Sequence, residues 1–279
     1  FMEQIKGLYR VSRPLTSLTG GLAVILGGYV AGTGEWFNIG LAVIVTLMGA
    51  AAANAWNDYQ DIEIDKVNQP NRPLPSGQVS PELVKNYSFV MAALAVLIST
   101  FINPTAFVIV LVSNIVLFIY SWKLKSTVLI GNLVVALISA MSVVFGGVAA
   151  GKPRPTFWLF LIIFVAILGR EVLKTMADYD GDLSEDVRTI STVWGKRAAR
   201  AVFYILAVAA LGMMLVPYIL EVYKPIYGYI VFIGVVPVFG YVLYRVSQKW
   251  SGPQLEQLSQ LMKYDFLVWF VAVVAGAYV

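Results

Sequence analysis

Oxygen-bearing side chains recur every four residues in two separate parts of the chain. The two series are Asn57, Asp61 and Asp65, and Asp178, Asp182 and Asp186. If the chain is helical there, a period of 3.6 residues places each series along one slowly drifting stripe. Carboxylate and amide oxygens suit Mg²⁺, which usually completes its coordination with water and the oxygens of a phosphate substrate. The spacing therefore predicts two helix ends that bind metal and a diphosphate together.

Cations extend the second series into the apolar run that precedes it. Lys174 and Arg170 continue the four-residue spacing backwards from Asp178. Ionisable side chains at membrane depth are functional by default. A solvated loop face or an ion-pair network would explain either motif alone, whereas two motifs with the same spacing favour a binding site.

The chain contains neither cysteine nor histidine. Disulfides, thiolate nucleophiles, zinc sites built from Cys and His, and imidazole acid–base catalysis are therefore excluded. Chemistry is left to carboxylates, amides, hydroxyls and cations.

The composition is that of an integral membrane protein. Of the 279 residues, 59% are hydrophobic and only 13% charged, against about 25% charged in soluble domains. Apolar runs long enough to cross a bilayer, and without the alternation of barrel strands, cover about 14–32, 38–56, 83–102, 104–121, 128–150, 156–175, 199–220, 226–246 and 260–278. We expect an all-α transmembrane bundle of nine helices that forms a single domain over residues 1–279.

The distribution of charge predicts the orientation in a cell membrane. With the N-terminus in the cytoplasm and the C-terminus outside, all lysines and arginines except Lys152, Arg154 and Lys224 fall on the cytoplasmic side, as the positive-inside rule requires. The carboxylates follow them, apart from Glu35 and Glu221. The two long connections, about 57–81 and 176–198, lie on that side and carry the acidic motifs, which predicts a cytoplasmic active site.

The first motif resembles the first signature of the UbiA superfamily of intramembrane prenyltransferases. The matching residues are Asn54, Asn57, Asp58, Asp61 and Asp65, followed by Asn71-Arg72-Pro73-Leu74-Pro75-Ser76-Gly77. The stretch from Arg170-Glu171 through Lys174 to Asp178 and Asp182 resembles the second signature, and smaller matches are Arg13-Pro14 and Tyr120-Ser121-x-x-Leu124-Lys125. The resemblance implies nine helices that bind a polyprenyl diphosphate through Mg²⁺ and transfer the prenyl group to an acceptor.

Within the superfamily the motifs look most like those of archaeal enzymes that alkylate the hydroxyl of geranylgeranylglyceryl phosphate in ether-lipid synthesis. Two departures bear on the acceptor. Many relatives carry a further aspartate directly after the lysine, where this chain has Thr175, and Thr189-Ile190-Ser191-Thr192 stands where Thr-Leu-Pro would be expected.

The resemblance assigns roles to individual residues. We expect Asn57, Asp61 and Asp65 to hold one Mg²⁺, and Asp178 and Asp182 to hold a second. Candidate contacts to the diphosphate or to an acceptor phosphate are Arg13, Asn54, Arg72, Ser121, Lys123, Lys125, Arg170 and Lys174. Tyr120 is the best candidate to shield an allylic cation, because aromatic faces attract positive charge. Asp61, Asp182, Tyr120 and Lys174 form the predicted catalytic group.

Several alternatives stay open at this level. Asn54 could order the first motif by a hydrogen bond rather than bind a ligand, and Asp58, which points away from the stripe, could pair with Arg72 or another cation. An aromatic ring could replace the lipid phosphate as acceptor, and a carboxylate, water or released diphosphate could take the acceptor proton. A transporter is disfavoured because its charges should lie near the midplane rather than on one side. We expect partners in the bilayer and no nucleic acid.

Overall fold

The computed structural model describes residues 2–124, 127–184, 186–248 and 251–278, and it contains only helices, turns and loops in these ranges. Nine helical segments among them are long and apolar enough to cross a membrane: Pro14–Ala31, Trp36–Gln60, Pro81–Ser99, Pro104–Leu124, Ile130–Ala149, Arg154–Ala177, Gly195–Ile219, Pro225–Ser247 and Gly252–Gly276. Each overlaps one predicted run. The prediction of an all-α transmembrane fold is confirmed.

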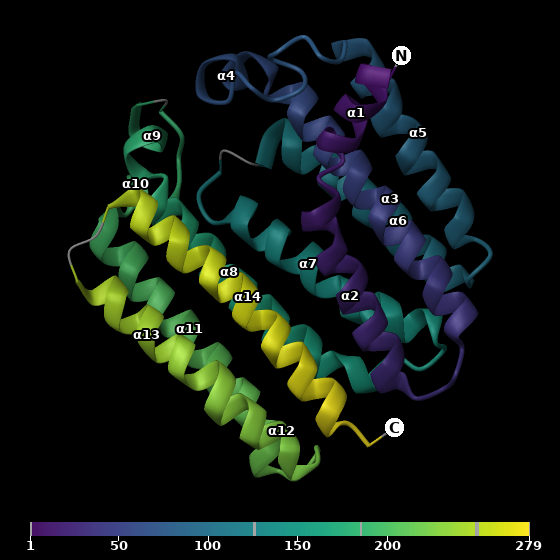
Figure 1. Cartoon of the computed structure of the whole chain (residues 1–279), viewed down its shortest axis with the longest axis vertical. Coiled ribbons are helices and arrows are strands. Elements are labelled where there is room, and N and C mark those ends of the chain that lie inside the picture. Colours follow the sequence, from purple (N-terminus) through teal and green to yellow (C-terminus); the bar gives the residue numbers. More distant parts are fainter. Residues whose placement is uncertain (1, 125–126, 185, 249–250, 279) are drawn as a thin grey trace. The chain divides into compact units, whose positions relative to one another are not determined.

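The helices are labelled in chain order in Figure 1. Their bounds are α1 Met2–Val11, α2 Pro14–Ala31, α3 Trp36–Gln60, α4 Ile62–Asn68, α5 Pro81–Ser99, α6 Pro104–Ile119, η1 Tyr120–Leu124, α7 Ile130–Ala149, η2 Arg154–Thr156, α8 Phe157–Ala177, α9 Tyr179–Ser184, α10 Ile190–Val193, α11 Gly195–Ile219, α12 Pro225–Ile230, η3 Val231–Val235, α13 Val236–Ser247 and α14 Gly252–Gly276. Short helices α4, α9 and α10 occupy the two polar connections that carry the acidic motifs.

Local sequence signals set many helix starts. Proline occupies the first turn of α2, α5, α6 and α12, where its missing N–H costs nothing. Asn103 accepts a hydrogen bond from the Ala106 N–H at 2.8 Å as the N-cap of α6. At α14, the Ser251 N–H donates to the Gln254 side chain at 3.0 Å, one half of a capping box, and this helix begins well before the apolar run expected from residue 260. The cap, rather than hydropathy, determines that boundary.

The chain divides into two compact units. The first comprises residues 1–125 and 142–154, and the second comprises residues 126–141 and 155–279. In the first unit, α3 packs against α2, α5 and α6, while α1 contacts α3 and α5. In the second, α8 packs against α11 and α14, and α14 also packs against α12, η3 and α13. Each unit contains one acidic motif at the end of a long helix, α3 in the first and α8 in the second.

Candidate active site

The first acidic motif lies where α3 ends and α4 begins. Asp61 is the residue between the two helices, with φ −92° and ψ 6°. The same conformation ends α11 at Leu220, so it marks the helix end rather than the chemistry of the residue. The four-residue hydrogen-bond pattern nevertheless continues, because the Asp61 N–H bonds the Asn57 carbonyl at 3.0 Å and the Asp65 N–H bonds the Asp61 carbonyl at 2.8 Å. The hydrogen bonds between residues four apart therefore continue from α3 through Asp61 into α4, although Asp61 separates the two helices.

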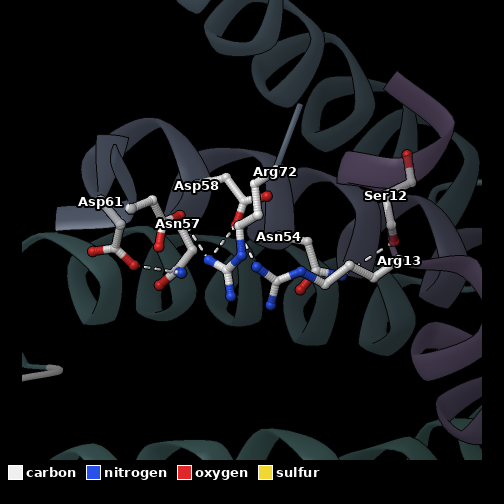
Figure 2. Close-up of polar contacts among 8 residues, drawn as sticks. Ser12, Arg13, Asn54, Asn57, Asp58, Asp61 and Arg72 are labelled. Carbon is white, nitrogen blue, oxygen red and sulfur yellow. Dashed lines mark hydrogen bonds and ion pairs between the residues drawn. The ribbon is translucent and has the colours of Figure 1, made fainter. Parts of the chain in front are cut away.

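The side chains of this motif are close together and buried. The Asn57 Nδ2 donates to the Asp61 Oδ2 at 2.9 Å. Asp61 is 9% exposed and Asp65 is 6% exposed. Figure 2 shows Asn57 and Asp61 together at the end of α3. Removing carboxylates from water is costly unless cations or donors surround them, so the motif must be supported electrostatically.

Two arginines provide that support. Arg13 makes an ion pair with Asp58, and Arg72 lies 3.7 Å from the same Asp58 oxygen, Oδ1. The other contact of Arg72 is a charge-assisted hydrogen bond from Nη1 to Asp65 Oδ2 at 2.6 Å. The two guanidinium groups lie beside Asp58 in Figure 2. Asp58, only 4% exposed, therefore pairs with cations as the sequence suggested, and it holds two of them.

The N-terminal segment is fastened to this motif. Asn54 Nδ2 donates to the Ser12 carbonyl at 3.2 Å, next to Arg13 in the chain (Figure 2). Arg10 donates through its two terminal nitrogens to the Asn71 carbonyl and to Gln78, both at 2.9 Å. The Asn54 amide thus makes an ordering hydrogen bond, one of the two roles that the sequence left open, and its role as a substrate contact stays a prediction. The contacts to the Ser12 and Asn71 carbonyls had no signal in the sequence, because main-chain acceptors leave no pattern in it.

Tyr120, Ser121 and Lys123 lie in η1, a π-helical turn that packs against α3. Single π turns are frequent at functional sites. Trp56 contacts α6 just before this turn: its Nε1 donates to the Phe118 carbonyl at 3.2 Å, and its ring stacks on Phe118 with centroids 5.0 Å apart. Lys123 lies over the Trp122 ring at 4.1 Å. The predicted contact residue Lys125 lies outside the described residues.

The second acidic motif repeats the backbone geometry of the first. Asp178 separates α8 from α9 with φ −86° and ψ 2°. Its N–H bonds the Lys174 carbonyl at 2.9 Å, and the Asp182 N–H bonds the Asp178 carbonyl at 2.8 Å. Asp178 and Asp182 therefore correspond to Asp61 and Asp65, and Lys174 takes the place of Asn57. Asp186 does not continue the series, since it lies in a loop with φ 57°.

Cations and a glutamate surround the base of this motif. Glu171 lies 3.2 Å from Arg170 Nη1 and 4.0 Å from Lys174 Nζ. Arg170 Nε donates to the Ser259 carbonyl of α14 at 3.2 Å. Partial desolvation raises the pKa of the Asp178 carboxyl although the residue is exposed at the surface, and the Lys174 ammonium opposes the rise. Lys174 is thus the cation electrostatically coupled to Asp178, while Arg170 contacts the neighbouring helix.

The two departures from the family pattern contact each other. Thr175, one residue after Lys174, is 8% exposed, and its Oγ1 lies 2.9 Å from the Oγ of fully buried Ser191. Lys196 further fixes the segment by packing over the Tyr179 ring at 3.9 Å and pairing with Asp180 at 3.7 Å. The unusual residues therefore form one hydrogen-bonded contact between α8 and α10.

The donor sets fit Mg²⁺ bound together with a substrate. Each motif offers two carboxylates from residues four apart, and the first adds the Asn57 amide. Within the described part of the chain, no three acidic side chains gather into a closed metal cluster. A pair of carboxylates that leaves coordination positions to water and phosphate oxygens is the usual Mg²⁺ environment. Such a site differs from a structural metal site, in which protein side chains supply every ligand.

Comparisons with known proteins agree with this arrangement. A profile of the UbiA prenyltransferase family matches residues 21–271. The chain belongs to this family. Curated relatives include the digeranylgeranylglyceryl phosphate synthases of Methanopyrus kandleri, 34% identical over 77% of this chain and 79% of the relative, and of Methanosphaera stadtmanae, 29% identical over 96% and 97%. The resemblance inferred from the motifs is confirmed, and the chain is an intramembrane prenyltransferase.

Solved structures of UbiA proteins share the fold. One, of a digeranylgeranylglyceryl phosphate synthase, has a TM-score of 0.82 and 28% identity, with 99% of each chain covered. Another, of a UbiA homologue from Archaeoglobus fulgidus bound to GPP and Mg²⁺, has a TM-score of 0.72 and 17% identity over 94% of this chain and 99% of that one. The UbiA fold thus extends over nearly the whole of this multi-pass membrane protein.

Proposed function

We propose that this UbiA protein transfers a polyprenyl group, geranylgeranyl in our assignment, from its diphosphate to the hydroxyl of geranylgeranylglyceryl phosphate in a Mg²⁺-dependent reaction. The observation that carries the proposal is the pair of carboxylate motifs at the ends of α3 and α8, in each of which the main-chain N–H of the second aspartate bonds the carbonyl of the first. The relatives named as digeranylgeranylglyceryl phosphate synthases support the choice of acceptor. Ether-lipid synthesis is therefore the assigned role.

The carboxylates divide into two metal-binding groups in this proposal. Asn57, Asp61 and Asp65 would hold one Mg²⁺, and Asp178 and Asp182 would hold a second. Bound metal would stabilise the oxygens of the departing diphosphate as a Lewis acid. The Archaeoglobus fulgidus homologue bound to GPP and Mg²⁺ supports the use of this ion by the fold.

The cations bind the phosphate groups that metal leaves unneutralised. Arg13 and Arg72 keep donors available, since each guanidinium has five and only some contact Asp58 or Asp65. Lys174, whose side chain is 38% exposed, would contact the diphosphate beside Asp178. An acceptor that carries its own phosphate needs such additional cations, whereas an aromatic ring does not.

The remaining roles follow from the elements that carry the residues. Tyr120 and Ser121, in the π turn η1 against α3, would contact the reacting end of the prenyl group, with Tyr120 shielding the allylic cation. Lys123 and Lys125, after them in the chain, and Arg170 near the second motif would add phosphate contacts. We assign the site to the cytoplasmic side, with the N-terminus cytoplasmic and the C-terminus outside, because the basic residues concentrate there.

The acceptor is tested by offering two of them. Purified protein is incubated with geranylgeranyl diphosphate, Mg²⁺ and either geranylgeranylglyceryl phosphate or 4-hydroxybenzoate, and the products are identified by mass. We expect prenylation of the lipid phosphate. Prenylation of 4-hydroxybenzoate alone would show that the acceptor is an aromatic ring and not the lipid phosphate. Absence of product and of diphosphate release with both acceptors would refute the proposed function.

The carboxylates are tested by isosteric substitution. Asp61→Asn and Asp182→Asn should abolish Mg²⁺-dependent turnover, since each removes an anionic ligand without changing side-chain volume. Asp186→Asn is the matched control, because Asp186 has the same spacing in sequence but lies in a loop, where Asn accepts its positive φ. Full activity of Asp61→Asn or Asp182→Asn would remove the metal assignment, and equal loss in Asp186→Asn would show that the effect is not specific.

A further inference from the structure

Each acidic motif has a buried side chain three residues before the aspartate that ends the long helix. In the first motif this is Asp58 before Asp61, and in the second it is Thr175 before Asp178. Asp58 is 4% exposed and Thr175 is 8% exposed. Since the two backbones match, the two side chains occupy equivalent positions on the buried side of their helices.

Both side chains bind the segment that returns after the motif. Asp58 lies 3.7 Å from Arg72, which follows α4 and also binds Asp65 at 2.6 Å. Thr175 contacts Ser191, in the first turn of α10, at 2.9 Å. The chain between each anchor and its partner contains the two carboxylates of that motif. The motif is therefore held at both ends in each case, by ions in the first and by hydroxyls in the second.

The direction of the hydrogen bonds in the second anchor follows from proton count. The Thr175 hydroxyl donates to the Val172 carbonyl at 2.8 Å. A hydroxyl has one proton, so Thr175 accepts the bond from Ser191. The resulting chain runs from Ser191 to Thr175 to the α8 backbone, and it leaves no charge in a buried place where an unpaired carboxylate would be costly.

We propose that Thr175 and Ser191 are positioning residues that hold Asp178 and Asp182 in their metal-binding arrangement, as an uncharged counterpart of the Asp58 ion pairs. The proposal rests on the function proposed above. Ser191 fixes α10, and Thr189 caps the same short helix by bonding Thr192. Loss of the anchor would let the segment that carries Asp182 move relative to Asp178, so more Mg²⁺ would be needed to occupy the site.

The test separates positioning from general destabilisation. Thr175→Val and Ser191→Ala each remove one hydroxyl of the pair, whereas Thr175→Ser keeps it. We expect the first two to raise the Mg²⁺ concentration for half-maximal diphosphate release about 3- to 10-fold, the range for loss of one net hydrogen bond. In Thr175→Val and Ser191→Ala, kcat at saturating Mg²⁺ should stay within about twofold of wild type. In Thr175→Ser, both kcat and the half-maximal Mg²⁺ concentration should stay within about twofold of wild type. The double variant should match the single ones, because both disrupt the same contact.

Ser88→Ala is the matched control, since Ser88 is also fully buried and donates to a carbonyl three residues earlier in its own helix, at 2.8 Å. It should leave the Mg²⁺ requirement unchanged. A half-maximal Mg²⁺ concentration that does not change in Thr175→Val and Ser191→Ala, or that changes equally in Ser88→Ala, would overturn the proposal.

A binding measurement gives a readout apart from activity. Mg²⁺ with inorganic diphosphate should raise the unfolding temperature of wild type and Thr175→Ser, and Thr175→Val should need several-fold more Mg²⁺ for the same rise. Equal Mg²⁺ dependence in all three would refute the positioning role. Wild type that binds Mg²⁺ and inorganic diphosphate but forms no product with either acceptor would refute the proposed function. The comparison of unfolding temperatures among the variants would still decide the positioning role.

Discussion

Within the first unit, α2 and the C-terminal part of α7 approach each other at main-chain distance, and Gly146→Ala should push them apart. A Cβ on Gly146 of α7 would lie 2.0 Å from the Val24 carbonyl oxygen of α2, and one on Gly27 would lie 1.8 Å from the Val143 carbonyl oxygen. Ordinary contacts between carbon and oxygen begin at about 3.3 Å. The overlap is therefore about 1.3 Å, and it falls on main chain, which cannot rotate away.

The magnitude follows from that overlap. Moving the helices apart by about 1 Å forfeits up to about half of each dispersion contact at the interface, where Val24 and Val143 are fully buried. Overpacking of this kind costs about 1–3 kcal/mol or more, and alanine returns up to about 1 kcal/mol of helix propensity. After that gain is subtracted, we expect the free energy of unfolding to fall by about 2 kcal/mol at most in Gly146→Ala if the overpacking cost stays within this range.

The assay compares unfolding of Gly146→Ala and Gly40→Ala with that of wild type in the same detergent. Gly40 is the matched control, because it is also helical and a Cβ there has no heavy atom within 4 Å. Gly40→Ala should be neutral or raise stability by up to about 1 kcal/mol. If Gly146→Ala unfolds at the same temperature as Gly40→Ala or above it, the two helices are not in backbone contact and the reasoning is refuted.

Three further predictions concern the site and the bundle. Asp58→Asn should lower the free energy of unfolding by about 1–2 kcal/mol, as measured in thermal melts. The loss is smaller than for a fully buried ion pair because Arg13 and Arg72 are about one-third exposed. Unchanged stability would show that these ion pairs contribute nothing. Removal of divalent metal with EDTA should stop diphosphate release, and Mg²⁺ should restore it more fully than Ca²⁺, which prefers more ligands; release that continues in EDTA would contradict metal dependence. Asp265→Leu should raise the free energy of unfolding in the same melts by about 1–3 kcal/mol. The reason is that Asp265 is 3% exposed and neither of its carboxyl oxygens bonds any described residue. A lower free energy of unfolding would indicate a stabilising contact at this carboxyl.

Much of this protein can be predicted from its sequence because the relevant signals are local. The length of an apolar run decides whether a helix can cross a bilayer, and the nine predicted runs correspond to nine spans in the described residues. The predicted helical arrangement of Asn57, Asp61 and Asp65 likewise continues past the end of α3, because main-chain hydrogen bonds join each of these residues to the next. Metal-binding chemistry could therefore be inferred before any fold was known.

The tertiary structure decided which side chains support that chemistry. Asn54 bonds Ser12, 42 residues away, Asp58 pairs with Arg13 from 45 residues away, and Thr175 meets Ser191 across 16 residues. Partners at such separations are set by helix packing and by the path of the returning chain, neither of which has a period in the sequence. Residue types and spacing thus predicted the candidate metal-binding groups, whereas only packing could specify the contacts around them.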